Sequence, residues 1–303
     1  MTQKVNFKNG NLTIAGIVFL PEGFDENKKY AALVVSHPAG GVKEQTASIY
    51  AAKMAEKGFV TLAFDATYQG ESTGEPRHLE DPNARVGDIS AVVDYLTTLP
   101  YVDADKIGAV GICASGGYVT AAVKQDHRIK AMASVSGVDI GEMYHVGWNG
   151  NGPDMDIPAT LEAIGKQRTA EANGAEPLIL DWIGKKEDIQ IPEMLDGYEY
   201  YKTDRAQHCN SSGELRFVDL QALIAFRAYD RVDTLLTQPL LIFAGSEAGT
   251  LWSSKLLNEK AASKNKELVV LEGFNHFDLY DKPECVNQIA DKMDPFFKNN
   301  LKN

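Results

Sequence analysis

The sequence contains few cysteines, and this scarcity excludes two kinds of protein. Its three cysteines, Cys113, Cys209 and Cys285, are widely spaced and form no Cys-x-x-Cys pair. A disulfide framework needs closely spaced even sets of cysteines, and a zinc site needs ligands in short, repeated spacings. We therefore expect no disulfides, no metal and no other cofactor, and a chain that works in a reducing compartment.

Basic charge and long hydrophobic runs are also scarce. The chain has 42 acidic and 30 basic residues and a net charge of −12, which argues against nucleic acid and anionic membranes as partners. No apolar run is long enough to span a bilayer, and residues 1–8 lack the apolar core of a signal peptide. We therefore expect a cytoplasmic protein.

Most of the 303 residues follow a regular alternation of strand and helix patterns. Short, continuously apolar segments predict buried strands, and segments of helical spacing lie between them. This pattern is typical of a mostly parallel, doubly wound α/β sheet that is covered on both faces. The expected strands are residues 12–20, 30–36, 59–64, 107–112, 129–135, 239–244 and 267–271, and the expected helices are residues 46–57, 89–96, 119–124, 253–262 and 285–301.

The alternation breaks between Val135 and Pro239. This stretch is polar and rich in Gly and Asn near residues 147–153, and helical patterns follow at residues 160–172 and 219–229. An insertion of this length at one crossover predicts a cap over the carboxyl edge of the sheet, where open α/β folds bind ligands. We therefore expect a core of residues 1–138 and 236–303, and an inserted helical cap of residues 139–235.

A candidate nucleophile follows the expected strand at residues 107–112. The strand turns into a helix through a cluster of small residues, which is the pattern of a nucleophile elbow. Cys113 is the favoured nucleophile because it directly follows the strand, and Ser115 is the alternative if the turn is shifted by two residues. The free N–H groups at the start of a helix would stabilise a thiolate or an oxyanion there.

The other parts of an acyl-transfer site map to the same edge of the sheet. His276 follows the last expected strand, so it is the candidate base for Cys113 or Ser115. The backbone N–H of Ala114 and that of Ala39 or Gly40 are candidates for the oxyanion hole. Only Glu247 carries a carboxylate in the loop of residues 245–250, where an orienting acid is expected. Either Glu247 orients His276, or the site works as a dyad.

The segment Gly111 to Gly117 has a cysteine followed by small residues and glycines, with Ser115 in place of one glycine. In this respect the chain resembles the α/β-hydrolase superfamily, and most closely the dienelactone-hydrolase type. Residues 37–45, 65–72 and 75–81 are similar to a bacterial subgroup of hydrolases that also includes fungal polyketide acyltransferases. The resemblance implies Cys113 as nucleophile and His276 as base, whereas the glycine-bearing loop around Glu247 departs from the superfamily pattern.

Four charged residues in these segments are candidates for the edge of the site, although ion pairing within loops explains them equally well: Lys43, Glu44, Arg77 and Glu80. The leading functional hypothesis is hydrolysis of a small ester, lactone or thioester through an acyl-enzyme, with a small-molecule acyl substrate as the partner. One alternative is an acyltransferase that uses the same intermediate. Another is a non-catalytic ligand-binding protein that keeps the fold. The sequence carries no signal for an oligomeric state.

Overall fold

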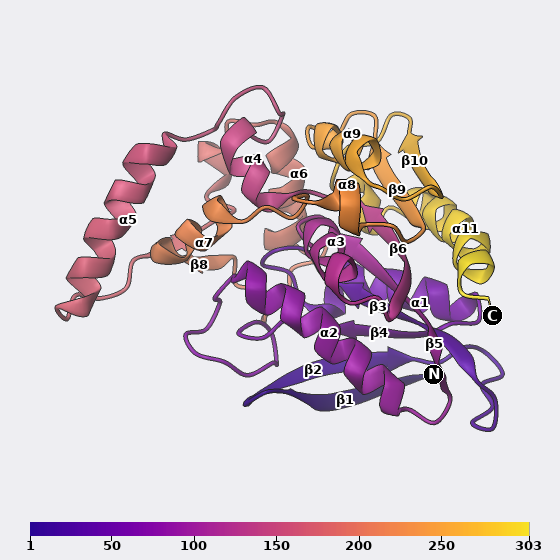
Figure 1. Cartoon of the computed structure of the whole chain (residues 1–303). Coiled ribbons are helices and arrows are strands. Elements are labelled where there is room, and N and C mark those ends of the chain that lie inside the picture. The colour runs from indigo at the N-terminus through magenta and orange to yellow at the C-terminus, as the bar shows by residue number, and fades with distance from the viewer. Residues whose placement is uncertain (303) are drawn as a thin grey trace.

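An eight-stranded sheet runs through the centre of the molecule, in the order β1-β2-β4-β3-β5-β6-β9-β10 (Figure 1). The computed structural model describes residues 1–302. β1 pairs with β2 and β2 with β4 in antiparallel fashion, and the remaining neighbours are parallel. The prediction of a mostly parallel α/β sheet is therefore confirmed, with a mixed edge. The strands are β1 (Thr2–Asn9), β2 (Leu12–Phe19), β3 (Tyr30–Ser36), β4 (Val60–Phe64), β5 (Val102–Ile112), β6 (Ile129–Val135), β9 (Leu240–Gly245) and β10 (Lys266–Leu271).

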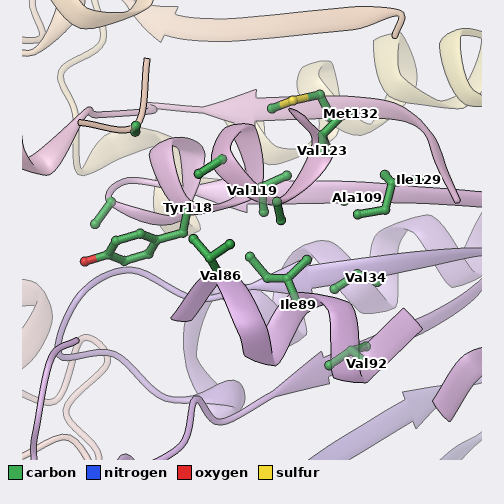
Figure 2. Close-up of a cluster of buried hydrophobic side chains, with 14 of the residues drawn as sticks. Val34, Val86, Ile89, Val92, Ala109, Tyr118, Val119, Val123, Ile129 and Met132 are labelled. Atoms are coloured by element: carbon green, nitrogen blue, oxygen red, sulfur yellow. The ribbon is translucent and has the colours of Figure 1, made fainter. Parts of the chain in front are cut away.

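Helices cover both faces of this sheet, because the central strands are apolar on both sides. α2 (Pro82–Thr98) and α3 (Ser115–Gln125) cover one face, where Val86, Ile89 and Val92 of α2 lie against side chains of the sheet and of α3 (Figure 2). α1 (Ser48–Glu56) and α11 (Pro283–Asn300) contribute to a second buried cluster. α2 begins earlier than predicted because Asp81 caps it, accepting a hydrogen bond from the N–H of Asn83 at 2.8 Å.

The chain between β6 and β9 forms the inserted segment, residues 139–235. It contains α4 (Ile140–Val146), α5 (Ile157–Ala172), β7 (Ile179–Asp181), α6 (Glu193–Lys202), β8 (Glu214–Arg216), α7 (Leu220–Ala225) and α8 (Val232–Leu235). α5 extends away from the rest of the molecule (Figure 1). The prediction of one helix over residues 219–229 is wrong in part. α7 ends at Ala225 because the backbone is extended at Phe226, and α8 begins only at Val232.

Two short helices complete the core, α9 (Leu251–Lys260) after β9 and α10 (Asp278–Asp281) before α11. Across residues 1–302, none of the helices combines the length and the apolar character needed to cross a membrane.

Candidate active site

The turn between β5 and α3 is tight and places Cys113 in a strained conformation. Cys113 has φ of +56°, in the left-handed region that non-glycine residues rarely adopt. The turn leaves no room for larger neighbours, because a Cβ atom on Gly111 would lie 2.1 Å from the carbonyl oxygen of Ser115. A Cβ atom on Gly116 would lie 2.4 Å from the Cα atom of Gly137. This turn therefore directs Cys113 into a cavity, which it lines.

Ser115, the alternative nucleophile, lies on the other side of the turn. It is the first residue of α3 and is fully buried. Its hydroxyl donates to the carbonyl of His37 and accepts from Nη2 of Arg85 at 2.7 Å. Ser115 is not among the residues that line the cavity, so the structure brings Cys113 to the cavity and leaves Ser115 beneath it.

His276 is fully buried at the carboxyl edge of the sheet, on the loop after β10. Its Nδ1 lies 2.6 Å from the hydroxyl of Thr250, and its Nε2 lies 3.0 Å from the hydroxyl of Tyr280. The ring of Trp148 packs against the imidazole with a centroid separation of 4.9 Å. Burial lowers the pKa of His276 to about 3, so the imidazole is neutral near pH 7.

The Tyr280 hydroxyl connects the imidazole to the thiol. Besides its contact with His276 at 3.0 Å, it lies close enough to the Cys113 side chain to lower the pKa of that thiol. Burial nevertheless raises the pKa of Cys113 to about 11, and Tyr280 and the N–H of Ala114 only partly oppose this rise. Among residues 1–302, no direct hydrogen bond joins Cys113 to His276, and His276 is not among the residues that line the cavity, so Tyr280 is the group that lies near both. Our sequence analysis missed Tyr280, although its position four residues after the candidate base is a usable signal.

Glu247, the candidate acid, does not lie at His276. Its side chain is exposed, and the Oε1 atom accepts a hydrogen bond from Ser246 at 3.3 Å. The backbone N–H of Glu247 donates to the carbonyl of Phe274, and the loop then continues to Thr250. Thr250 occupies the position at Nδ1 that was expected for a carboxylate. Sequence reasoning missed Thr250 because it searched this loop for an acid only.

The candidate oxyanion-hole residues Ala39, Gly40 and Ala114 all line the cavity with Cys113. Gly40 has φ of +65°, and a Cβ atom there would lie 2.6 Å from the Trp182 ring, so only glycine fits. Among residues 1–302, no hydrogen bond engages the N–H of Ala39 or Gly40. These two N–H groups are therefore available to an oxyanion, whereas that of Ala114 also bonds the Cys113 sulfur.

The cavity has a volume of about 100 Å³ and is walled by both parts of the chain. The inserted segment contributes the apolar side chains of Ile140, Met143, Tyr144, Trp148, Trp182, Leu215 and Leu223. Of the four charged residues expected at the site edge, Glu80 lines the cavity. Lys43 pairs instead with Glu44 at 2.7 Å, and Arg77 donates to the carbonyl oxygens of Gly70 and Ser72.

One carboxylate of the inserted segment holds the loops around His276. Oε1 of Glu193, in α6, accepts from the backbone N–H of His276 at 2.7 Å. Its Oε2 accepts from the N–H of Gly249 at 2.9 Å and from Nε1–H of Trp148 at 2.5 Å. Glu193 therefore connects α6 to the loops after β9 and β10, and sequence reasoning missed it because it lies far from both loops in the chain.

Comparisons of the sequence with known proteins point to one family. Residues 14–146 match the model of the dienelactone hydrolase family. The uncharacterised protein YcjY of Escherichia coli K12 is 46% identical, over 99% of this chain and 100% of its own length. The polyketide transferase claH of Penicillium crustosum is 33% identical, over 99% of this chain and 97% of its own.

Solved structures show the same fold. The hypothetical protein PA2218 of Pseudomonas aeruginosa superposes with a TM-score of 0.91 at 31% identity, over 99% of this chain and 94% of its own. The α/β hydrolase GrgF of Penicillium sp. sh18 superposes with a TM-score of 0.81 at 20% identity, over 99% of both chains. The second likeness shows the fold alone.

Proposed function

Because the chain belongs to the dienelactone hydrolase family of α/β-hydrolases, we propose that it hydrolyses a small ester, lactone or thioester through an acyl-enzyme on Cys113. The observation that carries the proposal is the placement of Cys113, in a strained turn, at a cavity that also contains three candidate oxyanion donors. The inserted segment would act as a cap over this site, which its share of the cavity wall supports.

In the first half of the reaction, the Cys113 sulfur attacks the acyl carbonyl carbon. The thiol proton passes to the Tyr280 oxygen while the Tyr280 proton passes to Nε2 of His276, which leaves Tyr280 neutral. The negative charge on the carbonyl oxygen is stabilised by the N–H of Ala114 and by that of Ala39 or Gly40. A neutral resting thiol agrees with this order, since the pKa of Cys113 is raised to about 11.

In the second half, the tetrahedral intermediate collapses and the bond to the leaving group breaks. The leaving group takes the proton from His276, and Cys113 remains as a thioester. Water then attacks the thioester carbonyl while His276 accepts its proton. The second tetrahedral intermediate then collapses and its carbon–sulfur bond breaks. The Cys113 sulfur takes the proton of the Tyr280 hydroxyl while His276 returns its proton to the Tyr280 oxygen, so that the carboxylic acid leaves and the thiol is restored.

Acyl transfer is the second candidate, and the enclosed, largely apolar cavity favours it. An alcohol or amine would replace water in the second half, as the name of the polyketide transferase claH suggests for that protein. The two reactions share the acyl-enzyme, so they differ only in the acceptor. Product analysis with p-nitrophenyl butanoate and added short alcohols would separate them.

The intact mass of the protein after exposure to p-nitrophenyl esters tests the proposal. We expect an acyl adduct on the wild type, no adduct on Cys113→Ala, and an adduct that persists on Ser115→Ala. Loss of the nucleophile should lower kcat by at least about 1,000-fold. A wild type that neither forms an adduct nor hydrolyses any ester would overturn the proposal and leave a ligand-binding protein.

A further inference from the structure

The polar side chains of the cavity have an unusual charge balance. Besides Cys113 and the two tryptophans, five polar or charged side chains line it, Gln69, His78, Glu80, Tyr144 and Glu214, and no lysine or arginine is present among the lining residues. His78 is already engaged, because its Nε2 lies 3.5 Å from Glu214 and its Nδ1 lies 3.3 Å from the Ser212 hydroxyl. The cavity therefore presents hydrogen-bond acceptors and negative charge to an acyl substrate.

Glu80 is the buried member of this set. Its side chain is only 4% exposed, yet it lines the cavity. Oε1 accepts from the Tyr118 hydroxyl at 3.0 Å, and Oε2 lies 3.5 Å from Nε2 of Gln69. A carboxylate has about four lone-pair positions, so these contacts leave acceptor capacity. Each oxygen already has one donor, so a ligand would add a further hydrogen bond to the carboxylate rather than supply a missing one.

The nearest guanidinium group, that of Arg85, does not form a hydrogen bond with Glu80. Nη1 of Arg85 lies 3.7 Å from Oε2 of Glu80, and its Nη2 donates to the His37 carbonyl and to Ser115. Arg85 is itself outside the cavity lining. Arg85 therefore balances the charge of Glu80 from outside the lining, while Glu80 itself lines the cavity.

We propose that Glu80 selects acyl groups that carry a hydrogen-bond donor, a hydroxyl or an ammonium group, and rejects acyl groups that carry a carboxylate. This inference rests on the proposed function, since it assigns the substrate class of the same site. A donor group would add a hydrogen bond to Glu80. A carboxylate would face Glu80 and Glu214 with no lysine or arginine in the lining to pair with it, and with His78 already engaged by Glu214.

A matched series of ethyl esters tests the proposal on the wild-type protein. The series is ethyl butanoate, ethyl 3-hydroxypropanoate, ethyl 3-aminopropanoate and monoethyl succinate, which place a methyl, hydroxyl, ammonium or carboxylate group at the end of a short acyl chain. We expect kcat/KM for the hydroxyl and ammonium esters to exceed that of butanoate by at least about ten-fold. We expect the succinate ester to fall at least about ten-fold below butanoate. Equal values, or a preference for succinate, would overturn the inference.

The variant Glu80→Gln assigns the preference to the residue. We expect the ratio of kcat/KM for the ammonium ester to that for butanoate to fall by at least about ten-fold. Using a ratio removes any general loss of activity. Glu272→Gln makes the same change at an exposed position outside the cavity and should keep the wild-type ratio. An unchanged ratio in folded Glu80→Gln would overturn the assignment, and if that variant does not fold, the wild-type series decides.

Binding of the same esters to Cys113→Ala, measured by calorimetry, separates this inference from the proposed function. If the wild type hydrolyses none of the esters but the variant binds them in the predicted order, the function fails and the substrate class stands. If the wild type hydrolyses all four at similar rates, the function stands and the substrate class fails.

Discussion

At the scale of single residues, the imidazole of His276, the proposed base, is oriented by the hydroxyl of Thr250. For Nε2 of His276 to accept a proton, the other nitrogen must carry its own, and Nδ1–H then donates to the Thr250 hydroxyl at 2.6 Å. This contact fixes the tautomer and the ring orientation, which is the part an acid plays in other sites of this kind. A neutral hydroxyl stabilises the imidazolium less than a carboxylate would, which agrees with a thiol nucleophile that needs less help than a serine.

The substitution Thr250→Val tests this role, because it keeps the shape of the side chain and removes the hydroxyl. We expect kcat/KM to fall by about 10- to 100-fold, since a lost hydrogen bond to a buried partner costs about 1–3 kcal/mol. Thr250→Ser keeps the hydroxyl and should retain most of the activity. Steady-state kinetics with an activated ester measure both, and a valine variant as active as the serine variant would contradict the prediction.

Tyr280→Phe tests the proton path from Cys113 to His276. Without the hydroxyl, the thiol loses a polar neighbour that opposes the rise of its pKa, so that pKa should rise further. We expect slower alkylation of Cys113 by iodoacetamide at pH 9 and an acylation rate at least about ten-fold lower. Peptide mass spectrometry and pre-steady-state kinetics measure the two effects.

Tyr50→Phe is the control, because its hydroxyl is equally buried but donates to the carbonyl of Leu279. It should lower stability and leave the alkylation of Cys113 at the wild-type rate. If Tyr280→Phe and Tyr50→Phe behaved alike in both assays, Tyr280 would have no special place on the proton path.

Local sequence identified Cys113 and His276 more readily than the partners of their side chains. The small residues around Cys113 and the position of His276 after a strand are local signals, and the structure places Cys113 at the cavity and His276 against the hydroxyl of Tyr280. The contacts of the imidazole are different, because they depend on the path of the loop after β9. That path turns Glu247 outward and Thr250 inward, and no residue pattern within the loop distinguishes the two outcomes.

At the scale of elements, α6 of the inserted segment is linked to the core through one side chain. Glu193 accepts three N–H donors, from His276, Gly249 and Trp148. Each hydrogen bond to a charged group contributes about 1.5–3 kcal/mol when it is shielded from water, and less here because Glu193 is half-buried. The position of His276 therefore depends on the docking of α6.

The variant Glu193→Ala should loosen this docking. We expect faster amide hydrogen exchange in residues 193–202 and a fall in kcat/KM of about ten-fold or more, since the base becomes less well positioned. Glu187→Ala removes an exposed carboxylate from the same segment and serves as the matched control. Unchanged exchange and kinetics in Glu193→Ala would show that other contacts hold α6.

The core strands could be predicted wherever burial on both faces makes their sequence apolar. β3, β4 and β6 and the second half of β5 are largely apolar, and the predicted ranges agree with the observed strands to within a few residues, apart from β5, which begins earlier, at Val102, with a polar stretch. β1 was missed because its side chains are mostly exposed and its sequence is polar. In the inserted segment, burial comes from contacts with the core, so periodicity alone misjudged where α7 ends.

At the scale of the whole molecule, the cavity lies where distant parts of the chain meet. Its walls combine loops of the core with α4, β8 and α7 of the inserted segment. The division into a core of residues 1–138 and 236–303 and a cap of residues 139–235 accounts for this arrangement and stays a proposal. The cytoplasmic location, expected from the absence of a signal-peptide pattern and of a long apolar run, also stays a prediction.

Two buried histidines make the stability of the folded protein depend on pH. Burial lowers the pKa of His276 to about 3 and holds that of His37 well below its ordinary value of 6.5. An unfolded chain binds protons at both positions below about pH 6.5, whereas the folded protein does not. The stabilisation from each histidine is therefore complete above pH 6.5 and is lost as the pH falls toward the folded-state pKa. Buried carboxyl groups with raised pKa values, such as Asp219 at about 6, act in the opposite direction.

A comparison of the wild type with His276→Gln isolates one of these contributions. Between pH 6 and pH 4, the free energy of unfolding of the wild type should fall by about 1.4 kcal/mol per pH unit more than that of the variant. Urea unfolding at pH 7, 6, 5 and 4 measures the difference, and the carboxyl contributions cancel because both proteins contain them. His127→Gln, at an exposed position, should follow the wild-type curve. Parallel curves for the wild type and His276→Gln would mean that His276 takes up a proton in the folded protein. The neutral base on which the proposed reaction depends would then be lost below pH 6.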